Sequence, residues 1–374
     1  VDGDKSQPYA PGMAAGSVTD DTEQALLIAS LLLKGHGSGL TLDAGEFSHA
    51  LLAWEDSMIE RGSLDLLGPS TKAALERVRA GEDPLCVGGE GTTNGAAMRV
   101  TPIGIAASTS DRQLFADAVW SSCQVTHATR QGFQSAALVA AAVSLGIDAG
   151  TADVTDLLWK AVAFVRSLPE RGAWSPDPDV VAATRRALKL ATQPSSSLEW
   201  LAGQIGTSVA SAQAIPMAFA LLARDPSPRA LLQAANLGGD TDTIGAIAGA
   251  ILGASLGVEV FDAYGLAQVE QVSQLDLPSV ATDLLALRDR EGGGAAPAAA
   301  TTSPNPEKPA LTPAASPQKG APAGRVVLMG QILVDLAVRG EALPAPGGDV
   351  WASDEGMHVG GGFNALVAAR RMGA

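Results

Sequence analysis

The chain has 374 residues, of which 25 are Lys or Arg and 40 are Asp or Glu, so its formal net charge is −15. Nucleic-acid backbones and anionic membrane surfaces repel a chain this acidic, which argues against both as its expected partners. Hydrophobic residues make up 46% of the sequence and aromatic residues only 4%, so the core must consist mainly of Ala, Leu, Val and Ile.

Cysteine use and the apolar segments predict a location. Cys86 and Cys123 form neither a CxxC pair nor a cluster with His, so we expect no disulfide framework and no zinc site, and we predict a cytoplasmic protein. Residues Val1–Pro8 lack the basic and apolar regions of a secretory signal. The longest apolar stretch that we identify, Ile244–Val258, is shorter than the roughly 20 residues that cross a bilayer, so we predict no membrane span.

Apolar residues recur with helical spacing from about Thr22 to Arg290, and Gly, Pro and Asp separate the segments. Few stretches alternate as a strand would, so we predict an all-α body. The predicted helices are Asp21–Lys34, Ser70–Ala80, Asp111–Ser122, Arg130–Leu145, Val154–Leu168, Val180–Leu190, Ser197–Gln204, Ser211–Arg224, Pro228–Ala235 and Thr243–Leu256.

The chain changes character after this body. Residues 292–323 are almost entirely Gly, Ala, Pro, Ser and Thr, which cannot form a packed core, so we predict a disordered linker. The apolar, β-branched run Arg325–Arg339 is predicted to form a strand. We therefore divide the chain into a helical domain at 1–291, a linker, and the start of an α/β domain at 324–374, which is too short to complete one.

Two acidic clusters precede predicted helices, one at Thr19–Thr22 and one at Gly238–Thr243. One Asp at a helix start is explained by capping, but each cluster has two, which is more than capping needs. Carboxylate and hydroxyl oxygens are the ligands that Mg²⁺ or Mn²⁺ prefers. Capping alone is the alternative for either cluster; their joint presence, with Gly238 and Gly239 allowing close backbone approach, favours a metal site.

Four segments carry a resemblance: Thr19–Ala25, Thr93–Gly104, Thr126–His127 and Asn236–Ala250. In sequence and order they resemble the ADP-ribosylglycohydrolase family, which includes the dinitrogenase-reductase-activating glycohydrolases. The match runs through residues 17–290.

The resemblance implies an all-α fold with two Mg²⁺ or Mn²⁺ ions that position ADP-ribose and hydrolyse its bond at C1″ of the distal ribose. The partner would be ADP-ribose, or a protein or small molecule that carries it. Metal ions can orient a water molecule and lower its pKa, and a carboxylate can stabilise positive charge that develops on the sugar. The catalytic carboxylates would be Asp20, Asp21, Asp240 and Asp242, and the metal ligands Thr19, Asp20, Asp21, Asp240, Asp242 and Thr243.

Residues on the substrate side are predicted from the same motifs. Backbone N–H groups of the loop 88–95 could hold a diphosphate, with Arg99 adding positive charge. A plain turn is the alternative for the loop, a structural ion pair for Arg99, and an ordinary core or surface position for His127. The predicted substrate-binding residues are Asn94, Gly95, Met98, Arg99, His127, Gly238 and Gly239.

A row of glycines every four residues, at 245, 249, 253 and 257, lies along one face of the predicted helix after Asp242. Small residues at this spacing let a neighbouring helix approach closely. We expect tight packing there to fix the loop that carries Asp240 and Asp242.

One departure from the family bears on activity. Only about 18 residues precede Thr19, whereas family members carry an additional first helix there, so we expect the domain to lack that helix. Two alternatives follow: a hydrolase of another phosphoribosyl or nucleoside-like glycoside, and a catalytically impaired module that binds ADP-ribose.

The segments Val326–Asp335, Leu343–Gly347, Gly360–Asn364 and Ala368–Gly373 resemble the start of the ribokinase-like (PfkB) carbohydrate kinases. The Lys usual in the glycine motif is replaced, and the kinase's anion hole, catalytic Asp and ATP loop are not in this chain, so we expect no phosphoryl transfer by it. A fusion would let a complete kinase phosphorylate a product of the first domain. The implied sugar-binding residues are Asp335, Gly361, Gly362 and Asn364.

Overall fold

The computed structural model describes residues 13–35, 39–61, 67–149, 153–193 and 196–291, together with the strands at 334–340 and 352–359. The region from 13 to 291 is helical, as predicted. Its helices are α1 (Asp20–Lys34), α2 (Ala44–Glu60), α3 (Pro69–Arg79), α4 (Gly95–Met98), α5 (Thr101–Ala106), α6 (Arg112–Cys123), α7 (Arg130–Ala149), α8 (Val154–Arg166), α9 (Val180–Ala191), α10 (Leu198–Ile205), α11 (Ser211–Arg224), α12 (Arg229–Ala235), α13 (Thr241–Leu256), the short 3₁₀ turn η1 (Val258–Val260), α14 (Ala263–Ser273) and α15 (Leu277–Glu291).

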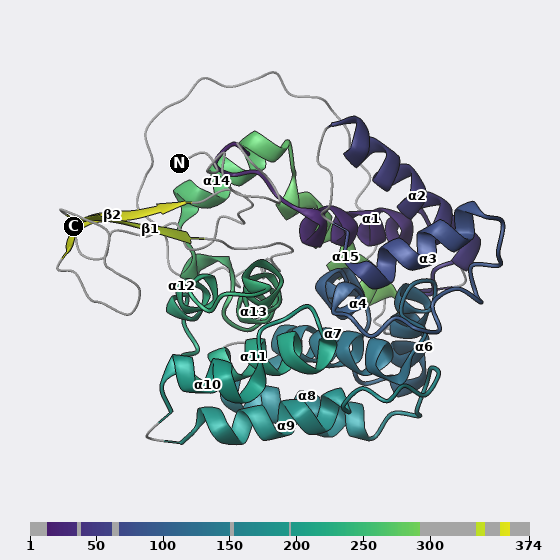
Figure 1. Ribbon diagram of the computed structural model, residues 1–374. Helices are drawn as coiled ribbons and strands as arrows, with labels where there is room; N and C mark the ends of the chain where they lie inside the picture. Colours follow the sequence, from purple (N-terminus) through teal and green to yellow (C-terminus); the bar gives the residue numbers. More distant parts are fainter. Residues whose placement is uncertain are drawn as a thin grey trace.

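The helices stack in layers (Figure 1). Helices α8 and α9 form one side, α7 and α11 lie on them, and α13, α4 and α5 cover α7 from the other side. Helix α1 packs beyond them against α2, α4, α5 and α15. The core is therefore shared by many helices and made of Ala, Leu, Ile and Val, as the composition predicts.

Helix α7 is the central element. By length and composition it is apolar enough to cross a membrane, but 78% of its apolar window is buried inside the described fold, as expected for a core helix. It approaches α13 closely, because a Cβ added at Gly146 would lie 2.9 Å from the Ser255 hydroxyl oxygen. All of α13 from Thr243 to Ser255 is buried, so this helix is held firmly on α7.

All ten predicted helices are present, with ends displaced by a few residues at most. Helices α2, α4, α5, α14 and α15 were not predicted. Helix α2 is capped by Asp43, whose carboxylate accepts the Glu46 N–H, and α15 is held by Arg288, which donates to the Ala107 carbonyl and to Asp148. The Asp43 cap is a local contact, whereas the contacts of Arg288 join distant parts of the chain and are not visible as local periodicity.

A two-stranded antiparallel sheet follows in sequence, formed by β1 (Val334–Gly340) and β2 (Ala352–Val359). The pairing aligns Val334 with Val359 and shifts register between Leu336 and Val338. Strand β1 overlaps the end of the predicted strand Arg325–Arg339. The rest of that segment and the predicted linker lie outside the described residues.

Candidate active site

The two acidic clusters meet where α1 and α13 begin. The N-cap residues are Thr19 for α1 and Asp240 for α13, and neither side chain makes a capping hydrogen bond. By contrast, Asp43, Asp111, Asp153, Asp179 and Asp262 each cap a helix in the same fold. Capping therefore does not explain the two clusters, so their carboxylates are candidates for binding a ligand or a metal ion.

Burial and mutual repulsion act on these carboxylates together. Asp20 and Asp21 are 8% and 2% exposed. Burial, and then the charges of Asp242 and Asp240, raise the pKa of Asp20 well above its usual value. Burial, and then the charges of Asp20, Asp242 and Asp240, raise the pKa of Asp21 in the same way. Burial and Asp242 raise the pKa of Asp240 to about 7. The four aspartates thus lie close enough to repel one another.

The donor chemistry fits a hard divalent cation. Thr19 donates its hydroxyl to Asp21 Oδ2 at 3.3 Å, while Asp21 Oδ1 is buried without a hydrogen-bond partner. A buried carboxylate oxygen with no donor is costly unless a cation or another proton compensates it. Within the described residues, however, no three His, Cys, Asp or Glu side chains converge in the arrangement of a closed metal site. The residues fit a cation by type and charge, and their side chains do not converge on one point.

Asn94, the N-cap of α4, connects the loop 88–95 to this cluster. Its side-chain amide donates to Oδ2 of Asp240, a contact that opposes the rise of that carboxyl's pKa. Asn94 and Met98 are buried, at 4% and 8% exposure. The structure therefore places Asn94 against the carboxylates, where it orients Asp240. Its contact with a substrate stays a prediction.

His127 lies behind this loop in a chain of buried polar groups. Its Nε2 is 2.9 Å from the Thr93 hydroxyl and its Nδ1 is 2.7 Å from the Thr126 hydroxyl. A Cβ added at Gly95 would lie 2.9 Å from His127 Cε1, so only glycine fits against the ring. Burial, and then the nearby Arg99 charge, lower the pKa of His127 well below its usual value, which keeps the imidazole neutral. His127 thus supports the loop from inside.

The structure gives Arg99 a different place from the one predicted. The residue is fully buried, and its guanidinium donates to Gln24 Oε1 at 2.8 Å and to the Thr126 hydroxyl. It also lies over the Phe47 ring, 5.3 Å from the centroid. Burial lowers its pKa to about 10. Its charge is therefore used inside the helical body and is not exposed to a diphosphate.

The glycine loop before Asn94 packs against the chain 124–129. Added Cβ atoms at Gly88 and Gly91 would lie 2.4 Å from the Gln124 carbonyl oxygen and 2.1 Å from the Thr126 carbonyl oxygen. The Gly88 carbonyl also accepts the Ala128 N–H at 2.7 Å. These two glycines serve close packing, whereas Gly89 faces open space.

The turn before α13 depends on a contact that the sequence did not reveal. The Asp240 N–H donates to the Thr207 carbonyl at 2.7 Å, and a Cβ on Gly239 would lie 2.4 Å from that same oxygen. Gly238 has a positive φ of 71°, like Gly239 at 78°, but faces open space. Thr207 belongs to no motif, so only the folded chain shows that it positions Asp240.

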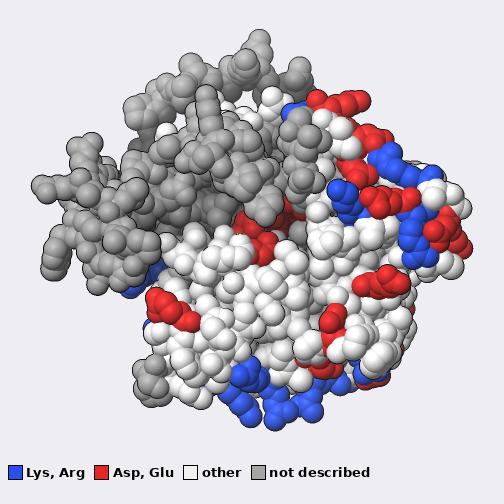
Figure 2. All heavy atoms as spheres, in the orientation of Figure 1, with Lys and Arg blue, Asp and Glu red and all other residues white. Residues whose placement is uncertain are grey.

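Viewed from outside, acidic atoms appear near the centre of the face shown in Figure 2, over the region where α1, α4 and α13 lie in Figure 1.

Of the residues predicted for the kinase segment, Asp335 lies in β1 opposite His358. Gly361, Gly362 and Asn364 lie outside the described residues.

Comparison with known proteins agrees with this helical fold. The ADP-ribosylglycohydrolase family profile matches residues 2–294, most of the chain. The chain belongs to the ADP-ribosylglycohydrolase family. It is 33% identical to the uncharacterized protein YegU of Escherichia coli over 282 residues, which cover 73% of this chain and 81% of that protein.

Named relatives and a solved structure extend the comparison. The bovine and human ADP-ribosylhydrolases ARH3 are 30% and 29% identical to this member of the family, over 67% and 68% of its chain and 74% and 75% of theirs. A chain of an ADP-ribosylglycohydrolase-related protein complex aligns with a TM-score of 0.53 at 22% identity, covering 75% of this chain and 83% of that one. The structural likeness shows the shared helical fold, and the family supports glycohydrolase activity on ADP-ribosylated substrates.

Proposed function

We propose that this glycohydrolase cleaves the N- or O-glycosidic bond between ADP-ribose and a protein side chain or small conjugate, and that it depends on two divalent ions, Mg²⁺ or Mn²⁺. The observation that carries the proposal is the proximity of four aspartates at the starts of α1 and α13. Asp20 and Asp21 are buried, Asp240 and Asp242 are half-buried, and the N-cap residues Thr19 and Asp240 make no capping hydrogen bond. Such an accumulation of like charge requires a cation or shared protons.

The residues that would hold the ions are Thr19, Asp20, Asp21, Asp240, Asp242 and Thr243. Bound divalent ions supply a Lewis acid and a water molecule of lowered pKa. The chain itself contributes orientation: Asn94 fixes Asp240 from one side, and the Thr207 carbonyl fixes its backbone from the other. A carboxylate at this position can stabilise the positive charge that develops on the ribose as the leaving group departs.

Two alternatives are kept for the helical domain. One is hydrolysis of another phosphoribosyl or nucleoside-like glycoside. The four aspartates Asp20, Asp21, Asp240 and Asp242, here called the Asp cluster, do not identify the residues that would contact a leaving group. The other is an ADP-ribose-binding module with impaired catalysis. A cytoplasmic location stays a prediction, and so do the two expected partners, ADP-ribose itself and a protein or small molecule that carries it.

The C-terminal region is proposed as the start of a ribokinase-like kinase, on the strength of its sequence motifs. Residues 324–374 would then belong to a bifunctional protein in which the kinase acts on a ribosyl product. A chain extended by a complete kinase domain should phosphorylate ribose or a nucleoside with ATP. Absence of phosphorylation across a panel of ribosyl compounds would contradict the pairing of activities.

The deciding experiment is calorimetry of ADP-ribose binding with Mg²⁺ and with EDTA, followed by turnover of arginine-linked and serine-linked ADP-ribosyl peptides. We expect binding and turnover with Mg²⁺ and loss of both with EDTA. Asp240→Asn should abolish turnover, whereas Asp283→Asn, an exposed aspartate on α15, should leave it unchanged. Turnover that persists in EDTA and in Asp240→Asn would overturn the metal assignment. Metal-dependent binding without turnover would support the binding module instead.

A further inference from the structure

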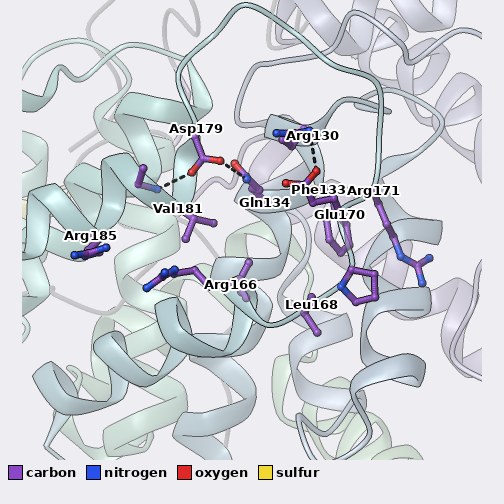
Figure 3. A pocket seen from close by; sticks show the side chains of 13 residues that line it. Arg130, Phe133, Gln134, Arg166, Leu168, Glu170, Arg171, Asp179, Val181 and Arg185 are labelled. Carbon is purple, nitrogen blue, oxygen red and sulfur yellow. Dashed lines mark hydrogen bonds and ion pairs between the residues drawn. The ribbon is translucent and has the colours of Figure 1, made fainter.

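A cavity of about 320 Å³ lies away from the Asp cluster, between the first turn of α7, the end of α8 and the first turns of α9 (Figure 3). Its volume is within the range of about 300–1,000 Å³ that is usual for small-molecule sites. Its charged lining residues are Arg130, Arg166, Arg171 and Arg185, with Glu170 and Asp179. In a chain with a net charge of −15, this is an unusual concentration of positive charge.

Two of the four arginines are already used. Arg130 pairs with Glu170 at 2.8 Å, and Arg171 pairs with Asp117 at 2.5 Å. Asp179 accepts from Gln134 and from the Ala182 N–H, so this carboxylate is also engaged. Glu170 is therefore paired with Arg130, and Asp179 is hydrogen-bonded to neutral donors. Neither carboxylate forms an ion pair with Arg166 or Arg185 in the described part of the chain.

Arg166 and Arg185 are exposed and make no hydrogen bond or ion pair with any part of the chain that the structure describes, as Figure 3 also shows for the residues drawn. Arg166 gains some stability from its place in the last turn of α8, where the helix dipole favours a cation. Arg185 lies inside α9 and gains nothing comparable. Both guanidinium groups are available to a ligand.

Beneath the arginines, the cavity has an apolar floor. Phe133, Val165, Leu168 and Val181 are all at most 8% exposed and line it. Arg171 lies over the Phe133 ring, 5.9 Å from its centroid, which holds this guanidinium at the cavity. Charges beside a low-dielectric surface interact more strongly than charges in open water. An anion held by these arginines would therefore be bound more tightly than by arginines on a flat surface.

From these observations we propose that the cavity between α7, α8 and α9 is a second ligand site, which binds a small molecule bearing phosphate groups. Guanidinium groups bind phosphate oxygens through paired hydrogen bonds, and several arginines around one cavity match a ligand with several charged oxygens. The proposal does not depend on the activity of the Asp cluster. It places an anion site on the same molecule as a cation site.

The test uses inorganic pyrophosphate as the probe, the full chain as the protein, and EDTA in the buffer. Without divalent ions the Asp cluster repels pyrophosphate, so calorimetry reports on the arginines. We expect saturable binding, and a Kd that rises about tenfold or more in Arg166→Gln/Arg185→Gln, since each lost hydrogen bond to a charged group weakens binding severalfold. The double variant Arg112→Gln/Arg186→Gln makes the same charge change outside the cavity and should shift the Kd by less than about twofold.

Thermal unfolding supplies a second readout that also verifies folding. Pyrophosphate should raise the Tm of the wild type and of the control variant, and should leave the Tm of the pocket variant unchanged. Absence of binding to the wild type, an equal loss in the control variant, or equal affinity for citrate would overturn the proposal. Loss of pyrophosphate binding in Asp240→Asn would also overturn it, because the ion would then be at the Asp cluster.

Discussion

At the scale of single residues, folding brings the carboxylates of the Asp cluster together although their charges repel one another. Burial and mutual repulsion raise the pKa values of Asp20, Asp21 and Asp240 above 3.8, the usual value for Asp. The folded protein therefore holds protons that the unfolded chain releases. The free energy of unfolding must fall as pH rises across this range.

This sign gives a pH prediction. In EDTA, the stability that the cluster contributes is fully present below about pH 4 and is lost as pH rises through the folded pKa, which is about 7 for Asp240. Asp240→Asn removes one of these titrating groups. The stability of the variant relative to the wild type should therefore increase as pH rises from about 5 to about 8. Tm values of both proteins at the two pH values measure the difference. An unchanged difference would contradict the prediction, and adding Mg²⁺ at the higher pH should stabilise the wild type more than the variant.

Asn94 is the neutral residue on which the cluster's geometry depends most directly. In Asn94→Ala, Asp240 loses a donor, so its carboxylate is less well oriented and its pKa rises further. Removing a group that orients a metal ligand typically costs about 10–100-fold in metal affinity or activity. Turnover at saturating Mg²⁺ and the Mg²⁺ concentration for half-maximal activity measure this effect. Asn236→Ala is the control, because that amide bonds the Leu232 carbonyl of its own helix and should change turnover by less than about twofold.

At the scale of elements, the site depends on the conformation of the turn that precedes α13. The turn before it contains two glycines with positive φ, yet only Gly239 lies against another segment, the carbonyl of Thr207. The sequence showed that the turn was permissive. It could not show which glycine was packed, because Thr207 is brought there by tertiary structure. The same limit applies to Arg99, whose motif position indicated a ligand contact and whose burial depends on Phe47, Gln24 and Thr126.

The two glycines form a matched pair for a test. Gly238→Ala introduces only backbone strain, which costs about 1–2 kcal/mol of stability. Gly239→Ala adds a collision with the Thr207 carbonyl, so it should cost more stability and should displace Asp240 as well. Chemical denaturation and turnover per folded molecule separate the two effects. Equal losses of activity in both variants would mean that the turn acts through its backbone freedom alone.

At the scale of the whole molecule, the helical body is closed by its last helix. Motifs and periodicity predicted the all-α body, most of its helices and the meeting of the two acidic clusters. Helix α15 was not predicted, although its buried residues Leu277, Ala281, Leu284 and Leu287 recur at helical spacing. Polar contacts hold it as well: Arg288 is 8% exposed and donates to the Ile105 and Ala107 carbonyls and to Asp148. These contacts join residues more than a hundred positions apart, which no local pattern encodes.

Arg288 should therefore contribute strongly to the stability of the entire helical body. Arg288→Met leaves the carbonyls of Ile105 and Ala107 without this charged donor, and a buried acceptor that loses its donor costs about 1–3 kcal/mol. The Asp148 side chain is 47% exposed, so water can replace the donor there. Arg290→Met, two residues further along α15 and exposed, should change stability by less than about 0.5 kcal/mol. Denaturant unfolding followed by helical circular dichroism measures both. Because α15 packs on α5 and α1, and Asp20 and Asp21 lie at the start of α1, the Arg288 variant should also lose ADP-ribose binding at temperatures where the control keeps it. Equal stability of the two variants would show that the contacts of Arg288 do not stabilise the helical body.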